Sequence, residues 1–457
     1  MYRIDSNIYH GRTKTYKLSA KSGVRIFLFI LLWIPFITTP QALWVFIPLH
    51  QIIIAFSILL SFVIYGYKST SIIRKHVDIL APILFSIFAY LVFWFIASFF
   101  TEFPVVTLHV LHSLVVRILY FIVLLSAFFF IFPLDNFWRY FSFYHVVVTF
   151  FSILLFILLG IGVNLPFTKF TLEDLTGAGF DSIPRYLNYY IGFVTTIFPF
   201  GNTRRLIRIM GYCDEGGTYA VFILPFLVYL ESSKNTFRYK IWYINILRIG
   251  LLLSFSLGGW LSYILFMIIR IVSEKKKTKN ILKMIGVISI LVLISISLYI
   301  AFPQAKWIID KYLFERALSS DQGSLNTEHG RIIANKESLR IFSEHPIIGT
   351  GPGQIRFEAE VDVSSFISIL ASNGIVGTLL FLFPWGIIFL LSLKMALRGN
   401  KVWFYVYVVH LTSLLHRGSL SGFLDFLIAA SVVVAYIGKG QINLQDLSNK
   451  IYLRVNT

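Results

Sequence analysis

The sequence predicts an all-α, polytopic integral membrane protein with about twelve transmembrane helices and two large external loops. Hydrophobic residues form 57% of the 457-residue chain and charged residues only 14%, which excludes a soluble globular protein. Most apolar residues fall into runs long enough to span a membrane. Two polar stretches, 162–216 and 303–362, interrupt these runs. We therefore treat residues 1–457 as a single membrane domain.

The apolar runs define the expected spans in chain order. They lie at about 24–39, 42–65, 79–100, 105–132, 138–161, 217–231, 241–257, 259–273, 281–302, 364–397, 402–416 and 422–437. A helix needs roughly 20 apolar residues to cross a bilayer, so the shorter runs are expected where a helix is buried or the membrane is thin. The two runs that meet at Ser256-Leu257-Gly258-Gly259 require a tight turn.

The basic residues set the orientation of these spans. With the N-terminus inside, the cytoplasmic segments carry 25 Lys and Arg residues and the external segments carry 13. This bias agrees with the positive-inside rule. It places both termini in the cytoplasm and both long loops on the external face of the inner (plasma) membrane. The net charge of +18 is thus explained by topology, and we do not expect a nucleic-acid partner.

One apolar stretch, at 188–200, tests this orientation. If NYYIGFVTTIFPF crossed the membrane, every later loop would change sides and the basic loop at 270–283 would face outward. We therefore predict a re-entrant or interfacial helix, because irregular backbone at membrane depth is tolerated where it lines a protein cavity.

The first external loop ends in a cluster of arginines and glycines. Arg204, Arg205 and Arg208 precede Glu215 and Gly216, where a span begins. Arginine binds diphosphate oxygens through its planar fork, and glycines at a helix N-terminus allow backbone N–H groups to approach an anion. Glu215 is the candidate general base toward a sugar hydroxyl. Alternatively, the arginines reach lipid headgroups and the acidic residues cap the helix.

The second external loop carries a similar set of residues. Helical periodicity from Arg331 to Phe342, which includes Arg340, predicts an amphipathic helix. The proline after His345 stops this helix. A Gly-Thr-Gly-Pro-Gly turn with Gly349 and Gly351 then brings the backbone close to another group. The two arginines are candidate phosphate ligands, and His345 is a candidate proton shuttle. The alternative for His345 is a charge interaction with the helix C-terminus.

Few ionisable residues fall inside the spans. Arg117 and Arg248 do, and intramembrane charges are functional candidates by default. We count Arg248 among the candidate substrate-binding residues. The alternative for both is an internal pair, and Asp425, near His416 and Arg417, is expected to form one. The single cysteine, Cys213, excludes an internal disulfide framework and a cysteine-based metal site.

The order of these motifs resembles the O-antigen polymerase and O-antigen ligase superfamily, the Wzy-type membrane glycosyltransferases. The matching pieces are Arg208-Ile-Met-Gly211, Glu215-Gly-Gly-Thr-Tyr-Ala220, Arg331 opening an amphipathic helix, Glu344-His345-Pro-Ile-Ile-Gly-Thr-Gly-Pro-Gly353, and Phe366-Ile-Ser-Ile-Leu-Ala-Ser-Asn-Gly-Ile-Val-Gly377. The motifs cover about 200–390, and the topology covers the whole chain.

The resemblance implies transfer of a glycan from an undecaprenyl diphosphate donor, with no nucleotide sugar and no obligatory metal or cofactor. Partners are then the lipid-linked oligosaccharide, membrane lipids, a chain-length regulator and a flippase. Ligases of this superfamily usually carry a histidine just before the helix that leads to the Gly-Ile-Val-Gly block. Here that place reads Val361-Asp-Val-Ser-Ser365, which favours a polymerase of O-antigen, capsule or another surface polysaccharide.

Three other functions were weighed against a polymerase. A ligase of the same superfamily is the nearest alternative. A lipid-linked oligosaccharide flippase would line a central path with charges from several spans, whereas this chain concentrates its charges in the external loops. A receptor or scaffold would not need arginines beside glycine turns in two loops.

Overall fold

The structure is a computed structural model of the chain. It describes residues 30–32, 34, 50–101, 104–130, 132–170, 186–189, 193–200, 204–211, 213, 216–273, 329–352, 354, 366–416 and 422–438. The predicted spans at 24–39 and 281–302 therefore lie outside the described residues, apart from helical residues at 30–32 and 34.

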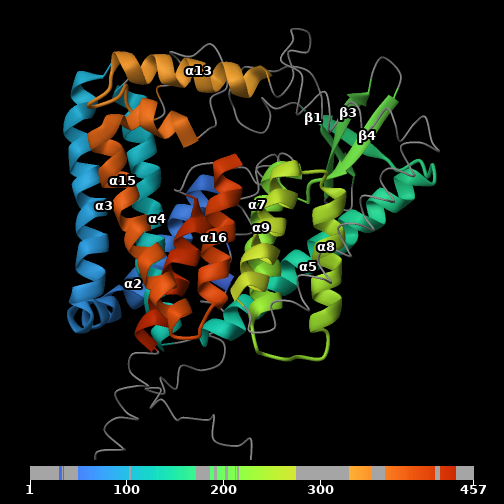
Figure 1. Cartoon of the computed structure of the whole chain (residues 1–457), viewed down its shortest axis with the longest axis horizontal. Helices are drawn as coiled ribbons and strands as arrows, with labels where there is room; N and C mark the ends of the chain where they lie inside the picture. The colour runs from blue at the N-terminus through green and yellow to red at the C-terminus, as the bar shows by residue number, and fades with distance from the viewer. Residues whose placement is uncertain are drawn as a thin grey trace, which may run out of the picture.

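The described chain is a helical bundle with one small sheet (Figure 1). Its helices are α2 (His50–Lys75), α3 (Val77–Ala97), η2 (Ser98–Phe100), α4 (Pro104–Phe130), α5 (Leu134–Gly160), α7 (Gly216–Ser232), α8 (Lys240–Leu253), α9 (Leu257–Ser273), α13 (His329–Glu344), α15 (Phe366–Leu397) and α16 (Val402–His416), followed by a final helix, Phe423–Gly438. Its strands are β1 (Phe167–Phe170), β2 (Tyr186–Tyr189), β3 (Phe193–Phe200) and β4 (Arg204–Ile209).

Four of these helices are long and apolar enough to cross a membrane. They are Val77–Ala97, Pro104–Phe129, Leu134–Gly160 and Ile367–Leu397, and shorter apolar helices lie at Ile52–Val63, Gly216–Ser232, Leu257–Ser273, Val402–Leu414 and Phe423–Gly438. Large apolar side chains such as Val63, Phe85 and Ile241 are more than two-thirds exposed, as expected of a surface that faces lipid. The membrane class is thus supported, whereas the total of about twelve spans remains a prediction.

The helices pack around a core of aromatic side chains. Trp138 of α5 is fully buried. Its indole ring lies 4.9 Å from the ring of Phe226 in α7 and 5.2 Å from that of Trp403 in α16. Its Nε1 donates a 2.8 Å hydrogen bond to Ser431 Oγ of the final helix. One side chain thus joins four helices, and its only polar atom is satisfied.

The turn between α8 and α9 lies slightly earlier than the sequence suggested. It occupies Ser254–Ser256, and Phe255 adopts a positive φ of 47°. Gly259 is already helical, and a Cβ there would lie 2.6 Å from the Cβ of Ala220. This glycine therefore allows α9 to approach α7 closely, rather than forming the turn.

The predicted helix at 188–200 is wrong. This stretch contributes to β2 and β3 of a four-stranded antiparallel sheet with the order β1-β2-β3-β4. Its Val, Thr and Phe residues favour a strand, and a short apolar run cannot be assigned to helix or strand by periodicity alone. The first external loop is therefore a small sheet, and the all-α prediction holds only for the remaining described residues.

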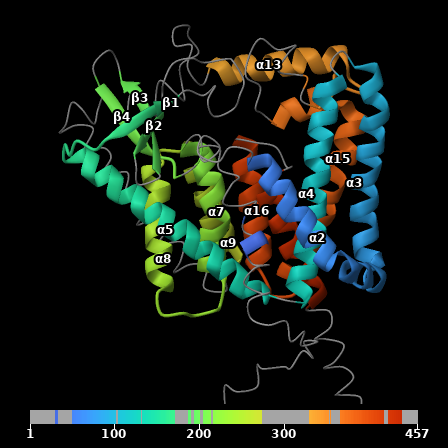
Figure 2. The ribbon, with the colours of Figure 1, turned by 180° about the vertical axis from the view of Figure 1, so that it is seen from behind.

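The sheet and α13 lie at the same end of the bundle (Figures 1 and 2). β4 leads into the N-terminus of α7 and contacts α5 and α8, whereas α13 packs against α15. The α7–α8 connection, which carries Lys234 and Arg238, lies at the opposite end (Figure 1). The two loops predicted to share one face do share one end of the molecule.

Candidate functional site

The three arginines of the first loop all belong to β4. Arg204, Arg205 and Arg208 stand opposite Phe200, Pro199 and Thr196 of β3. Successive positions of a strand alternate between the two faces of the sheet. Positions 204 and 208 therefore share one face, and position 205 belongs to the other.

A buried turn carries the chain from β4 to α7. Ile209 and Met210 are fully buried, and the N–H of Cys213 donates a 2.9 Å hydrogen bond to the carbonyl of Met210. Gly211 has a φ of +55°, and a Cβ there would lie 2.9 Å from the ring of Tyr219. The Arg-Ile-Met-Gly motif is thus a tight packing element that holds the end of β4 beside α7.

The structure describes only some residues of the anion site predicted at the start of α7. Gly216 is the first residue of α7 and is buried, so this glycine does open a helix as the sequence predicted. Glu215, the candidate base, lies outside the described residues, and so does the carboxylate before it. Their roles stay predictions.

The predicted helix of the second loop is confirmed as α13. It ends at Glu344, one residue from the predicted stop. Arg331 lies in its first turn, and its side chain is outside what the structure describes. Arg340 forms ion pairs of 2.5 Å with Glu337 and 2.6 Å with Glu344. Through its hydrogen bonds, the Arg340 guanidinium lowers the pKa of the Glu337 carboxyl. A diphosphate at Arg340 would have to compete with these two carboxylates.

His345 is exposed at the C-terminal end of α13. Its N–H donates to the carbonyl of Ile341 at 3.0 Å, and its carbonyl accepts from the N–H of Gly349 at 3.0 Å. The residue therefore joins the helix to the following turn. Its exposed ring is compatible with either a proton shuttle or a charge interaction with the helix end.

The glycine turn after His345 contacts a break in α15. The helix contains Gly374 with φ 60° and ψ −171°, which is not a helical conformation. The N–H groups of Thr350 and Gly351 donate to the carbonyls of Ala371 and Ser372 at 3.2 and 2.9 Å. Gly349 and Gly351 were candidate substrate contacts. The structure instead places these glycines against another part of the chain.

Polar side chains from α3 and α4 secure both sides of this contact. Asn373 Oδ1 accepts hydrogen bonds from Tyr90 Oη at 2.8 Å and Trp94 Nε1 at 3.0 Å. Gln354 Nε2 donates to Thr107 Oγ1 at 2.9 Å. All five side chains are buried. The sequence analysis did not single them out, although a buried Asn or Gln amid apolar residues signals a specific hydrogen-bonded contact.

Arg248 lies in a cluster remote from these loops. Its Nε bonds Glu231 Oε1 at 3.0 Å and Tyr263 Oη at 2.9 Å, and Arg270 Nη1 lies 3.3 Å from Glu231 Oε2. Glu231 belongs to the last turn of α7, at the end of that helix opposite to the sheet. This is the internal pair that was the alternative to substrate binding.

A second buried ionisable group lies between α4, α16 and the final helix. Asp425 hydrogen-bonds to His410 Nε2 and to the N–H of Gly422. The guanidinium of Arg117 lies 5.7 Å from the centre of the Phe423 ring. Asp425 thus forms an internal pair as predicted, and His410 is its described partner. The side chain of His416 lies outside what the structure describes. Arg417 is outside the described residues.

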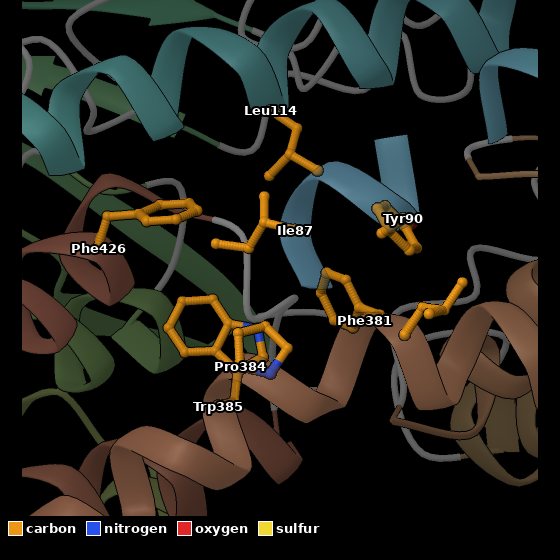
Figure 3. Close-up of a pocket in the computed structure, with 8 residues that line it drawn as sticks. Ile87, Tyr90, Leu114, Phe381, Pro384, Trp385 and Phe426 are labelled. Atoms are coloured by element: carbon orange, nitrogen blue, oxygen red, sulfur yellow. The ribbon is translucent and has the colours of Figure 1, made fainter. Parts of the chain in front are cut away.

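The described bundle contains a small apolar pocket (Figure 3). Its volume is about 20 Å³, and its lining residues are Ile87, Tyr90, Leu114, Leu380, Phe381, Pro384, Trp385 and Phe426. This volume is about that of one water molecule, so the pocket is too small for a sugar. Within the described ranges, no group of three or more His, Cys, Asp and Glu residues is placed to hold a metal ion.

The predicted site residues fall into two groups at one end of the molecule. One group is the junction of β4 with α7, and the other is α13 with the turn that follows it. The sheet packs over α5, α7 and α8, whereas α13 packs over α15. Arg248 belongs to neither group.

Comparison with known families finds one match. Residues 242–382 match the family model Wzy_C, described as O-antigen ligase. The matched region runs from α8 through α13 to the part of α15 just beyond its break. Members of that family are membrane enzymes that transfer glycans in polysaccharide and lipopolysaccharide biosynthesis. No curated protein matches the chain.

Proposed function

We propose that this chain is a polysaccharide polymerase of the plasma membrane. It would transfer a glycan from an undecaprenyl-diphosphate-linked donor to an acceptor repeat unit on the external face. The observation that carries glycan transfer is the family match over 242–382, and the segment 361–365, which has no histidine, favours a polymerase. That region includes an arginine-bearing surface helix, α13, at the same end of the bundle as the arginine-bearing strand β4.

The reaction requires charge stabilisation at the leaving group. The acceptor hydroxyl attacks the anomeric carbon, the bond from that carbon to the diphosphate oxygen breaks, and the electron pair leaves with the prenyl diphosphate. Preorganised arginines stabilise the developing negative charge. We assign this role to Arg208 and Arg331, with Arg204, Arg205 and Arg340 as further candidates.

The same step releases one proton from the acceptor hydroxyl. We assign its removal to Glu215, with His345 as the alternative base. Gly216 opens α7 directly after Glu215, so the backbone N–H groups of that helix terminus are available to an anion. No step requires a metal or a nucleotide.

The printed name of the matched family favours a second candidate, an O-antigen ligase. A flippase is less well supported. In the described spans, Arg248 and Asp425 are bound to Glu231 and His410, respectively, rather than arranged along a path.

The surface glycans of a strain that lacks this chain distinguish these functions. For a polymerase, an electrophoretic profile will show a core with a single repeat unit and no ladder. If lipid-linked polymer accumulates without attached repeats, the chain is a ligase. If lipid-linked units stay on the inner leaflet, it is a flippase and the proposal is wrong.

Two substitutions test the assigned residues within the intact chain. We expect Arg331→Ala and Arg208→Ala to reduce the polymerisation rate by about 100-fold, the usual effect of removing one oxyanion donor. Lys336→Ala on α13 and Lys169→Ala on β1 are the controls, because Lys336 shares a helix with Arg331 and Lys169 shares the sheet with Arg208. Unchanged polymer length in Arg331→Ala, with normal protein levels, removes Arg331 from the site.

A further inference from the structure

The break in α15 exchanges helical hydrogen bonds for bonds to a second segment. In an unbroken helix the N–H groups of residues 375 and 376 donate to the carbonyls of residues 371 and 372. Here the N–H groups of Ile375 and Val376 donate to the carbonyls of Pro346 and Ile347, at 2.9 and 3.1 Å. The freed carbonyls accept from the turn, as described above. Two bonds within the helix are thus replaced by four between the helix and the turn.

The fit of these two segments depends on glycine at both sides. Gly349 has a φ of +79°, and a Cβ there would lie 2.4 Å from the backbone N of Gly374. Gly374 has a φ of +60°, and a Cβ there would lie 2.4 Å from the carbonyl oxygen of Ile347. Neither position accepts a side chain without separating the two backbones. We call residues 346–351 and 371–376 together the clasp.

Asn373 ties the clasp to the membrane-embedded bundle. Its side chain accepts from Tyr90 and Trp94 of α3, and its Nδ2 donates to the carbonyl of Ile369 at 2.9 Å. One turn later, Gly377 lies against α3, where a Cβ would be 3.1 Å from Trp94 Nε1. The amide therefore fixes the broken part of α15 to the neighbouring helix α3 through two hydrogen bonds, and a third stays within α15.

The clasp continues directly into α13. Ser338 and Ile341 on the inner face of α13 are fully buried, and only His345 separates the helix from the clasp. The bonds made at the break therefore lie next to the C-terminal end of α13. Among the described residues, α13 is also held by its buried face against α15.

We propose that Asn373 is a positioning residue that acts through the clasp to hold α13, with Arg331 and His345, in register over the bundle. The effect of Asn373 on the transfer rate rests on the proposed function. Its effect on the position of α13 does not, because that position can be measured in a protein without activity. A displacement of a reacting group by about 1 Å can lower a rate by about 100-fold. A small movement of α13 is therefore enough to slow glycan transfer.

The test measures the position of α13 in the full-length protein reconstituted in lipid. Spin labels are placed at exposed positions on α13 and α3, through Lys336→Cys and Phe85→Cys, in a Cys213→Ala background. The Asn373→Leu substitution keeps the branching of the side chain at Cγ but removes all three hydrogen bonds. The matched control is Ser392→Ala, because Ser392 is buried in the same helix and bonds only its own helix, at Phe389 O.

We expect the label-to-label distance distribution of Asn373→Leu to be at least twofold wider than that of the parent protein and of Ser392→Ala. The transfer rate should fall about tenfold or more. If Asn373→Leu does not fold, Tyr90→Phe removes a single hydrogen bond without changing shape, and it should widen the distribution by a smaller amount.

The outcomes separate the two proposals. A wider distribution in a protein whose parent transfers no glycan supports the positioning role and overturns the proposed function. An unchanged distribution and rate in Asn373→Leu, beside an active parent, overturns the positioning role and leaves the proposed function standing.

Discussion

Gly349→Ala is the sharpest single test of the fold. Alanine at a φ of +79° costs about 1–2 kcal/mol, because its Cβ is crowded in the left-handed region. The new methyl group would also lie 2.4 Å from the backbone N of Gly374 and 2.6 Å from the carbonyl carbon and oxygen of Ser372. These are backbone atoms and cannot rotate away, so the turn must move off α15 by about 1 Å, the gap between this contact and an ordinary carbon–nitrogen distance.

That movement weakens the hydrogen bonds from the turn to Ala371 and Ser372. Each is worth about 0.5–1.5 kcal/mol, so the total loss of stability is about 2–5 kcal/mol. The assay is thermal unfolding of the purified protein in detergent, followed by the loss of the monomer peak in size-exclusion chromatography. We expect the Tm to fall by several degrees.

The control for this substitution lies in α15, the helix that the turn contacts. Gly386→Ala places its Cβ where no atom lies within 4 Å, so it should leave the Tm unchanged or raise it slightly, because alanine has the higher helix propensity. If Gly349→Ala and Gly386→Ala have the same Tm, the clasp does not contribute to stability and the reasoning from backbone contact is wrong.

Three further predictions concern charged groups. Asp425→Ala should lower stability by about 1–3 kcal/mol, since it leaves the buried His410 without its hydrogen-bond partner. Thermal unfolding measures this, and a Tm equal to the parent's would contradict the pair. Arg248→Gln should lower the Tm, because it weakens the hydrogen bonds and ion pairs around Glu231. The KM for the lipid-linked donor should stay constant. A raised KM with an unchanged Tm would instead indicate that Arg248 binds the substrate. Arg340 lowers the pKa of Glu337, so this pair's contribution is complete above the ordinary carboxyl pKa and is lost as pH falls through the lowered value. As the pH falls, amide exchange in α13 of the parent protein should therefore accelerate relative to the Glu337→Gln variant. Equal exchange in both proteins would show that the pair does not stabilise α13.

Local sequence pattern predicted most of the helices. The α16 bounds agree with the predicted span, and α7 differs by one residue at each end. Such agreement is expected because a long apolar run has one stable solution in a bilayer, a hydrogen-bonded helix. The amphipathic α13 was also predicted, since its pattern of apolar residues is local.

The stretch 188–200 shows where local pattern fails. It is apolar and lies in a loop that was predicted to be external, so its sequence predicted a re-entrant or interfacial helix. The structure forms strands instead because β3 finds partners on both sides, β2 and β4. Strand pairing depends on segments outside the window, so periodicity in a single run does not reveal it.

The sequence by itself determined the membrane class, the positions of most described helices and the gathering of arginines in two loops. It also showed that the turn at Gly349 and Gly351 must bring the backbone close to something. Only the tertiary structure decided that this partner is the break at Gly374, because the contact joins residues far apart in the chain and is made by backbone atoms that every residue possesses. Likewise, only the tertiary structure decided that Arg248 is bound to Glu231, since two charges in separate helices become partners only when those helices pack together.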